Sequence, residues 1–234
     1  MACRALMATP VQTPHVTSAT ILFMQLDHVS YAVRANELAD TVQRLGFELG
    51  ASFVDGGKHP RFGTRNFVLP LSNGTYIEVV APLEHPAAES AAFGQAVRQR
   101  AEAGGGWMGW VVQVDDITSF EQRLGRESSD GHRVRPDGFD VCWKQIGLWD
   151  LMEDPALPYF IQWSDLTLHP SVGSPAKATI SRLDIAGDRS KLDEYLGAPS
   201  DSLLDEITVN WIDHEEAGIH TVTFATENGL VTIE

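Results

Sequence analysis

Short segments of apolar and β-branched residues recur along this chain between polar turns, which is the pattern of β-strands. The first segment, Leu26–Val33, is followed by residues 37–45, whose apolar positions have helical spacing. We expect this helix to end at Gly46, because glycine readily adopts the left-handed conformation at a helix end. Further strands are predicted at 49–54, 65–71 and 75–81. The pattern therefore predicts a unit with the order βαβββ.

The same order of elements is predicted twice more. The second copy opens with a strand at 110–114 and a helix that ends at Gly125. The third opens with a strand at 180–186 and a helix that ends at Gly197. β-rich segments follow at 141–148, 159–164, 207–212, 220–226 and 230–233. Because one such unit exposes a face of its sheet, we expect two units to pair as a curled mixed sheet around a cleft.

The predicted fold class is α+β, with a domain at 24–170 made of the paired units 24–104 and 105–170. Residues 178–234 are predicted to form a third, partial βαβββ-like unit. Its sheet would lack a partner, so that it either packs against another chain or covers the edge of the cleft, and we expect a homodimer. Residues 1–23 contain prolines among short apolar stretches and are predicted to be a disordered leader. The sequence predicts no membrane partner, because it lacks a run of about 18 apolar residues.

Charge and cysteine content narrow the choice of partner and compartment. The chain has 17 lysines and arginines against 32 aspartates and glutamates, and its formal net charge is −15. Such a chain has no positive field to collect phosphates, which argues against nucleic acid and leaves a small molecule as the expected partner. Two cysteines, Cys3 and Cys142, predict no disulfide framework and favour the reducing cytoplasm.

Several short motifs resemble those of one superfamily. They are Leu26-Asp27-His28, His59-Pro60-x-x-Gly63-Thr64-x-Asn66, Gly74-Thr75-Tyr76-Ile77-Glu78, and Tyr159-Phe160-Ile161-Gln162-Trp163 with His169-Pro170 after it. With these motifs the sequence is similar to the vicinal oxygen chelate superfamily and, within it, to the glyoxalase-like branch. The resemblance spans about residues 25–170 and implies the paired fold. It specifies the reaction less well, because this fold hosts lyases, dioxygenases, epimerases and drug-binding proteins.

The resemblance implies that His28 and Glu78 are catalytic and hold a divalent metal such as Zn, Ni, Mn or Fe. Imidazole and carboxylate together suit such an ion, which would polarise a carbonyl group or open sites for O₂. The second unit departs from the family pattern, because its matching positions fall at 107–109 and on Gln162. Without a metal, His28 and Glu78 would serve directly as acid and base.

Other polar and aromatic residues of these motifs are expected to position a substrate. They are His59, Arg61, Asn66, Gln162 and Trp163. His59 or His169 would complete a metal site. Two simpler interpretations stay open: His28 as a hydrogen-bonded core histidine, and Glu78 in a salt bridge with Arg61 or Arg65.

The predicted function is that of a glyoxalase-like enzyme acting on a small oxygenated or carbonyl metabolite. The reaction would be of the lyase, isomerase or dioxygenase type. The alternative is a non-catalytic protein that sequesters a small molecule, as drug-resistance members of the superfamily do. The missing ligands of the second unit and the abundance of tryptophan favour this alternative.

Overall fold

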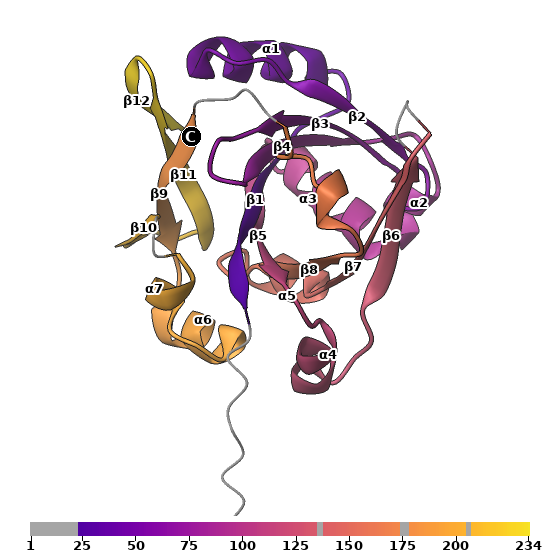
Figure 1. The fold of residues 1–234 in the computed structure, drawn as a ribbon, viewed down its shortest axis with the longest axis vertical. Coiled ribbons are helices and arrows are strands. Elements are labelled where there is room, and N and C mark those ends of the chain that lie inside the picture. Colours follow the sequence, from indigo (N-terminus) through magenta and orange to yellow (C-terminus); the bar gives the residue numbers. More distant parts are fainter. Residues whose placement is uncertain (1–22, 135–137, 174–177, 205–206) are drawn as a thin grey trace, which may run out of the picture.

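The computed structural model describes residues 23–134, 138–173, 178–204 and 207–234. The expected leader therefore lies outside the described residues, except for Phe23. The described chain is α+β, as expected, with a large curled sheet and a smaller second sheet beside it (Figure 1). Among the described residues, no helix combines the length and the apolar composition that a membrane span requires.

The large sheet contains two copies of the predicted unit. Its strands are β1 (Met24–Ala32), β2 (Val54–His59), β3 (Thr64–Pro70), β4 (Tyr76–Pro82), β5 (Gly106–Val114), β6 (Ser129–Val134), β7 (Asp140–Ile146) and β8 (Tyr159–Trp163). Their order is β2-β3-β4-β1-β5-β8-β7-β6, so the two units meet where β1 pairs antiparallel with β5. In each unit the first strand also pairs in parallel with the fourth. The paired curled sheet predicted from the sequence is confirmed.

The two ends of this sheet approach each other, so that the sheet nearly closes on itself. Strands β2 and β6 are in contact. The Nη1 of Arg133 on β6 donates a hydrogen bond of 2.6 Å to the carbonyl oxygen of Gly56 on β2. Closure leaves a concave interior that is shielded from water on most sides, which is where a small ligand is best enclosed.

Helices cover both faces of the curled sheet. They are α1 (Leu38–Leu49), α2 (Ala87–Ser90), α3 (Ala92–Glu102), α4 (Thr118–Leu124) and α5 (Leu148–Glu153). Phe93 and Val97 of α3 and Leu148 of α5 pack with Val80 and Ile161 of the sheet, in an apolar cluster on the concave side. Leu45 of α1 belongs to the larger cluster on the outer face.

The ends of two predicted helices are confirmed and one prediction is wrong. Gly125 and Gly197 cap α4 and α6 in the left-handed conformation. Helix α1 instead continues through Gly46 to Leu49, and Gly50 is its left-handed cap. The reason lies in the chain after the helix: Ala51 donates to the Gly46 carbonyl oxygen at 2.9 Å, and a Cβ on Gly46 would lie 2.8 Å from the Ala51 oxygen. Gly46 therefore lets the backbone at Ala51 pack directly against the helix.

The second sheet comes from the C-terminal segment. It contains β9 (Thr179–Ala186), β10 (Thr208–Ile212), β11 (Gly218–Thr226) and β12 (Gly229–Ile233), with η1 (Leu166–Leu168) before it and α6 (Arg189–Leu196) and α7 (Ser200–Leu203) between β9 and β10. The element order matches the predicted third unit. The strand order, β10-β9-β11-β12, differs from that of the other units, because β10 and β11 occupy both edges of β9.

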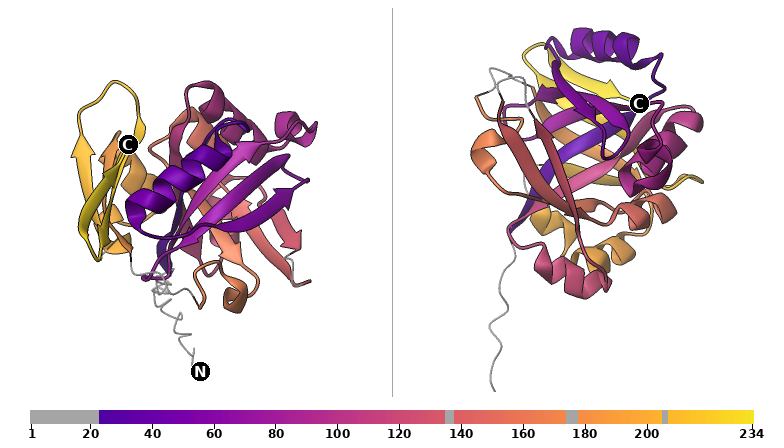
Figure 2. Two further views of the ribbon diagram at one scale, coloured as in Figure 1. Left: turned by 90° about the horizontal axis from the view of Figure 1, so that it is seen from above. Right: turned by 90° about the vertical axis from the view of Figure 1, so that its right-hand side faces the viewer.

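This sheet packs on the outer face of the curled sheet, along the seam between β1 and β5 (Figures 1 and 2). Leu183 and Phe224 join the same apolar cluster as Trp107 and Trp110 of β5. The indole Nε1 of Trp107 donates to the Ile233 carbonyl oxygen at 2.9 Å. The apolar face of the third unit is therefore covered within the chain. A homodimer stays a prediction.

Candidate functional site

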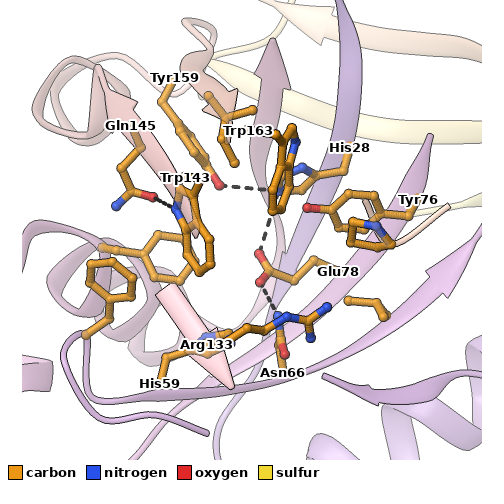
Figure 3. A pocket seen from close by; sticks show the side chains of 15 residues that line it. His28, His59, Asn66, Tyr76, Glu78, Arg133, Trp143, Gln145, Tyr159 and Trp163 are labelled. Atoms are coloured by element: carbon orange, nitrogen blue, oxygen red, sulfur yellow. Dashed lines mark hydrogen bonds and ion pairs between the residues drawn. The ribbon is translucent and has the colours of Figure 1, made fainter. Parts of the chain in front are cut away.

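The interior of the curled sheet contains a cavity of about 40 Å³ (Figure 3). Its aromatic lining residues are Phe62, Tyr76, Phe93, Trp143, Tyr159 and Trp163. Its polar lining residues are His28, His59, Asn66, Glu78, Arg133 and Gln145. Both units contribute, so the pocket exists only because the two halves of the sheet face each other. The free space holds about three water molecules, which restricts it to a small chemical group.

Glu78 lies in the middle of β4 and is only 5% exposed. Its Oε1 accepts a hydrogen bond of 2.6 Å from the Asn66 amide, and its Oε2 accepts one of 2.9 Å from the Ser30 hydroxyl. The alternative salt bridge to Arg61 or Arg65 is wrong, because Arg65 pairs with Asp55 at 2.9 Å and Arg61 lies outside this pocket. Burial of a carboxylate costs free energy, which the hydrogen bonds from Asn66 and Ser30 and the positive charge of Arg133 in the same pocket lining offset. A carboxylate held in this way inside a ligand-sized cavity is suited to a role in chemistry.

His28 lies on β1 beside this carboxylate. Its Nδ1 is 2.5 Å from Oδ1 of Asp27, and its Nε2 is 3.9 Å from Oε2 of Glu78 and 3.3 Å from the hydroxyl of Tyr159. The ring stacks on Tyr76 with centroids 4.2 Å apart. Since the Asp27 carboxylate only accepts, Nδ1 carries the proton and Nε2 is free to accept one within the pocket.

Asp27 is a functional residue that the sequence analysis missed. Neighbouring residues on a strand normally point to opposite faces, but a bulge between Leu26 and His28 turns Asp27 and His28 to the same side. Asp27 Oδ2 also accepts from Trp163 Nε1 at 2.8 Å and from His169 Nε2 at 3.2 Å. Burial alone would raise the pKa of Asp27, but the hydrogen bonds from His169 and His28 outweigh it and hold that pKa well below its usual range. Asp27 therefore stays ionised.

His59 is the last residue of β2, and its Nε2 is buried without a hydrogen-bond partner among the described residues. Burial lowers the pKa of His59 from 6.5 to about 4, against the opposing effect of Glu78, so its ring is neutral at pH 7. Burial, reinforced by the carboxylates of Asp27 and Glu78, raises the pKa of Tyr76 and of Tyr159. Both phenols are therefore protonated and act as donors.

The structure brings five of the seven predicted site residues together. They are His28, His59, Asn66, Glu78 and Trp163. Arg61 lies on the exposed turn after β2, outside this pocket. The expectation that Gln162 faces the ligand is wrong: its amide accepts from the Ile117 amide at 3.1 Å and donates to the Asp115 carbonyl oxygen at 2.6 Å. Alternation along β8 points Tyr159, Ile161 and Trp163 inward and Gln162 outward.

The strand register corrects the comparison of the two units. His28 is opposite Tyr76 in the first unit, and Val111 is opposite Tyr159 in the second. Val111 and Ile161 therefore occupy the positions of His28 and Glu78, instead of 107–109 and Gln162. Both residues are apolar, so the second unit contributes no metal ligand at these positions.

The remaining donors do not complete a metal centre. Among the predicted ligands, His28, His59 and Glu78 line the pocket, but both oxygens of Glu78 already accept hydrogen bonds and both ring nitrogens of His169 contact other side chains. Within the described ranges, no three His, Cys, Asp or Glu side chains are grouped to hold an ion. The donor set does not fit the two-unit metal site that the resemblance implied.

Two βαβββ units that enclose a pocket with a buried carboxylate and histidine define the class to which this protein belongs. The model of the glyoxalase-like domain family matches residues 26–196, and the chain is a member of that family. Among curated proteins, none matches the chain significantly.

The chain is similar to several solved structures at low sequence identity. A hypothetical protein from Staphylococcus aureus is 17% identical over 91% of this chain and 86% of its own, with a TM-score of 0.53. The methylmalonyl-CoA epimerase from Mycobacterium tuberculosis is 18% identical over 59% of this chain and 86% of its own, with a TM-score of 0.38. A Streptomyces coelicolor methylmalonyl-CoA epimerase in complex with 2-nitronate-propionyl-CoA is 17% identical over 61% and 96%, with a TM-score of 0.40. The first of these shows that the fold is shared with a solved structure over most of both chains.

Proposed function

We propose that this protein is an enzyme of the isomerase or lyase type that moves a proton on a small carbonyl metabolite. The observation that carries the proposal is the buried pair of Glu78 and His28, with Oε2 and Nε2 3.9 Å apart inside an apolar pocket. The cytoplasm stays the expected compartment, in keeping with the free thiol of Cys142.

In this proposal Glu78 is the general base. It takes a proton from the carbon next to the substrate carbonyl group, and the electrons of that C–H bond move onto the carbonyl oxygen as an enolate. The protonated hydroxyl of Tyr159 donates a hydrogen bond to this oxygen. Return of the proton to another position gives an isomer, and departure of a neighbouring group gives a lyase product.

Several contacts suit Glu78 and His28 to these roles. Hydrogen bonds from Ser30 and Asn66 hold the carboxylate in one orientation, so that little reorganisation is needed when it reacts. Asp27 orients His28 and stabilises its ring when Nε2 takes up a proton. The isomerase and lyase alternatives are favoured over a dioxygenase, because an O₂-activating metal needs ligands where the second unit has Val111 and Ile161.

Exchange of substrate hydrogen with D₂O tests the proposal. Small 2-oxo acids, hydroxyketones and aldehydes are incubated with the protein in D₂O, and deuterium at the carbon beside the carbonyl group is followed by NMR. Glu78→Gln keeps the shape but not the base, so exchange is expected to fall at least about 100-fold. Glu102→Gln, on the exposed side of α3, is the matched control and should exchange like the wild type. Exchange that persists in Glu78→Gln, or that no compound in the panel shows, contradicts the proposal.

The aromatic lining of the pocket supports a second candidate function, the non-catalytic binding of a small molecule. Trp143 and Trp163 form a wall with ring centroids 5.6 Å apart, on which a planar ligand can stack. Quenching of tryptophan fluorescence by such a ligand, with no hydrogen exchange and with equal affinity in Glu78→Gln, would favour the binder. Loss of exchange in that variant would favour the enzyme.

A further inference from the structure

A second and larger pocket, with a volume of about 380 Å³, adjoins the inner one. It lies between the turn after β2, the start of α3 and the end of β7. Phe62, Phe93 and Gln145 line both pockets, so the two lie side by side with these side chains between them. We propose that this outer pocket binds an anionic group, either a carboxylate or a phosphate, of an elongated substrate. The carbonyl end of that substrate would reach Glu78, so this inference rests on the proposed function.

Arg61 supplies the positive charge of the outer pocket. Its guanidinium group is exposed and, within the part of the chain that the structure describes, forms no ion pair or hydrogen bond. By contrast, the nearby Arg126 already pairs with the Asp150 carboxylate. An arginine can contact a carboxylate or a phosphate through two parallel hydrogen bonds. In a protein of net charge −15, an arginine left unpaired beside a pocket is suited to attract an anion.

The start of α3 faces the same pocket. This 11-residue helix has no side-chain N-cap and no acidic residue in its first turn, and Ala91 and Ala92 line the pocket. Free N–H groups and the helix dipole favour an anion at such a helix start. A Cβ on Gly94 would lie 2.2 Å from the Phe62 carbonyl oxygen, so the absence of a side chain there lets the turn that bears Arg61 pack directly on the helix.

Gln145 provides an independent indication that a ligand oxygen belongs at the junction. Gln145 is 4% exposed, and its side-chain oxygen accepts a hydrogen bond of 2.9 Å from Trp143 Nε1 (Figure 3). Because an indole only donates, this contact assigns the amide orientation and leaves Nε2 as a buried donor with no partner among the described residues. A buried unpaired donor destabilises the fold, and an oxygen of a ligand that reaches from one pocket to the other would satisfy it.

The outer pocket also contains an opposing charge that makes the proposal testable. Glu127 is exposed on the pocket wall and would repel an anion. Replacement of Arg61 and of Glu127 should therefore change anion affinity in opposite directions. Both side chains are exposed, so neither substitution is expected to disturb folding.

Binding of paired probes tests this inference by calorimetry on the full chain. The pairs are dihydroxyacetone phosphate with dihydroxyacetone, and 4-oxopentanoate with its methyl ester. The wild type is expected to bind the anionic member of at least one pair more tightly, and the preferred pair identifies phosphate or carboxylate. Arg61→Gln should weaken binding of that anion about fivefold and leave the neutral member unchanged. Glu127→Gln should strengthen binding of the anion.

The preference for the anion is expected to persist in Glu78→Gln, because that residue lies in the inner pocket. If the protein does not catalyse proton transfer, no hydrogen exchange is observed, but the preference for the anion is still expected. The two proposals can therefore fail independently. Equal affinity for the charged and neutral members of both pairs overturns the inference, as does an Arg61→Gln variant that binds the anions like the wild type.

Discussion

The burial of His59 predicts how the free energy of unfolding depends on pH. Its ring is 4% exposed, and burial lowers its pKa from 6.5 to about 4. Between these pH values the unfolded chain binds a proton at His59 and the folded chain does not. The free energy of unfolding therefore rises with pH across this interval; the contribution is complete above about pH 6.5 and is lost as the pH falls toward 4. The full interval corresponds to about 3 kcal/mol.

His59→Gln removes the titrating group and keeps an uncharged nitrogen at the position of Nε2. Urea unfolding, followed by tryptophan fluorescence at pH 7 and at pH 4.5, measures the effect. Between these two pH values the wild type is expected to lose about 2 to 3 kcal/mol more than the variant, because other titrating groups act on both proteins alike.

His85→Gln is the matched control for this measurement, since His85 is exposed on the surface. Its unfolding energy should follow that of the wild type at both pH values. Equal losses for the wild type and His59→Gln would refute the reasoning, because they would show that His59 is protonated in the folded protein as readily as in the unfolded chain.

Two further predictions concern the support of the site and of the second sheet. Asp27→Asn places an amide against two histidines and an indole, and should lower the free energy of unfolding by about 3 kcal/mol. The control Asp40→Asn, on the exposed side of α1, should change it by less than about 0.5 kcal/mol. Chemical denaturation at pH 7 measures both, and similar values would contradict the role of Asp27. Phe224→Ala should cost about 3–5 kcal/mol, and Leu230→Ala, at a residue that is 72% exposed, almost nothing. A melting temperature for Phe224→Ala that equals that of the wild type would show that the second sheet is not part of the common core.

Local patterns in the sequence predicted most of the secondary structure. Alternation of apolar and polar residues placed most strands within a few residues of their observed limits, because a half-buried strand has a period of two whatever its partners are. The strand predicted at 49–54 is wrong: α1 continues to Leu49, and β2 spans Val54–His59. The motifs around His28, Glu78 and Asn66 also predicted the inner pocket. These residues lie on strands whose order in the family fold is fixed, so their meeting follows from the resemblance.

Other features depend on contacts between distant segments. Asp27 joins the site only because a bulge in β1 reverses the local alternation, and a bulge arises from pairing with β5 rather than from the residues of β1 alone. Ile161 faces the pocket in place of Gln162 for a similar reason, since a shift of one residue turns a side chain to the other face of the sheet. The outer pocket combines Arg61, the start of α3 and Gln145, which no local pattern connects.

Most strands and helices, the repetition of the unit and the acidic character of the chain follow from neighbouring residues and from composition. Long-range packing alone places β10 beside β9, lays the third unit over the seam between β1 and β5, and joins Asp27, His28 and Glu78 in one buried network. The physical reason is that strand pairing and side-chain burial are settled by which distant surfaces exclude water together, and that choice belongs to the whole fold.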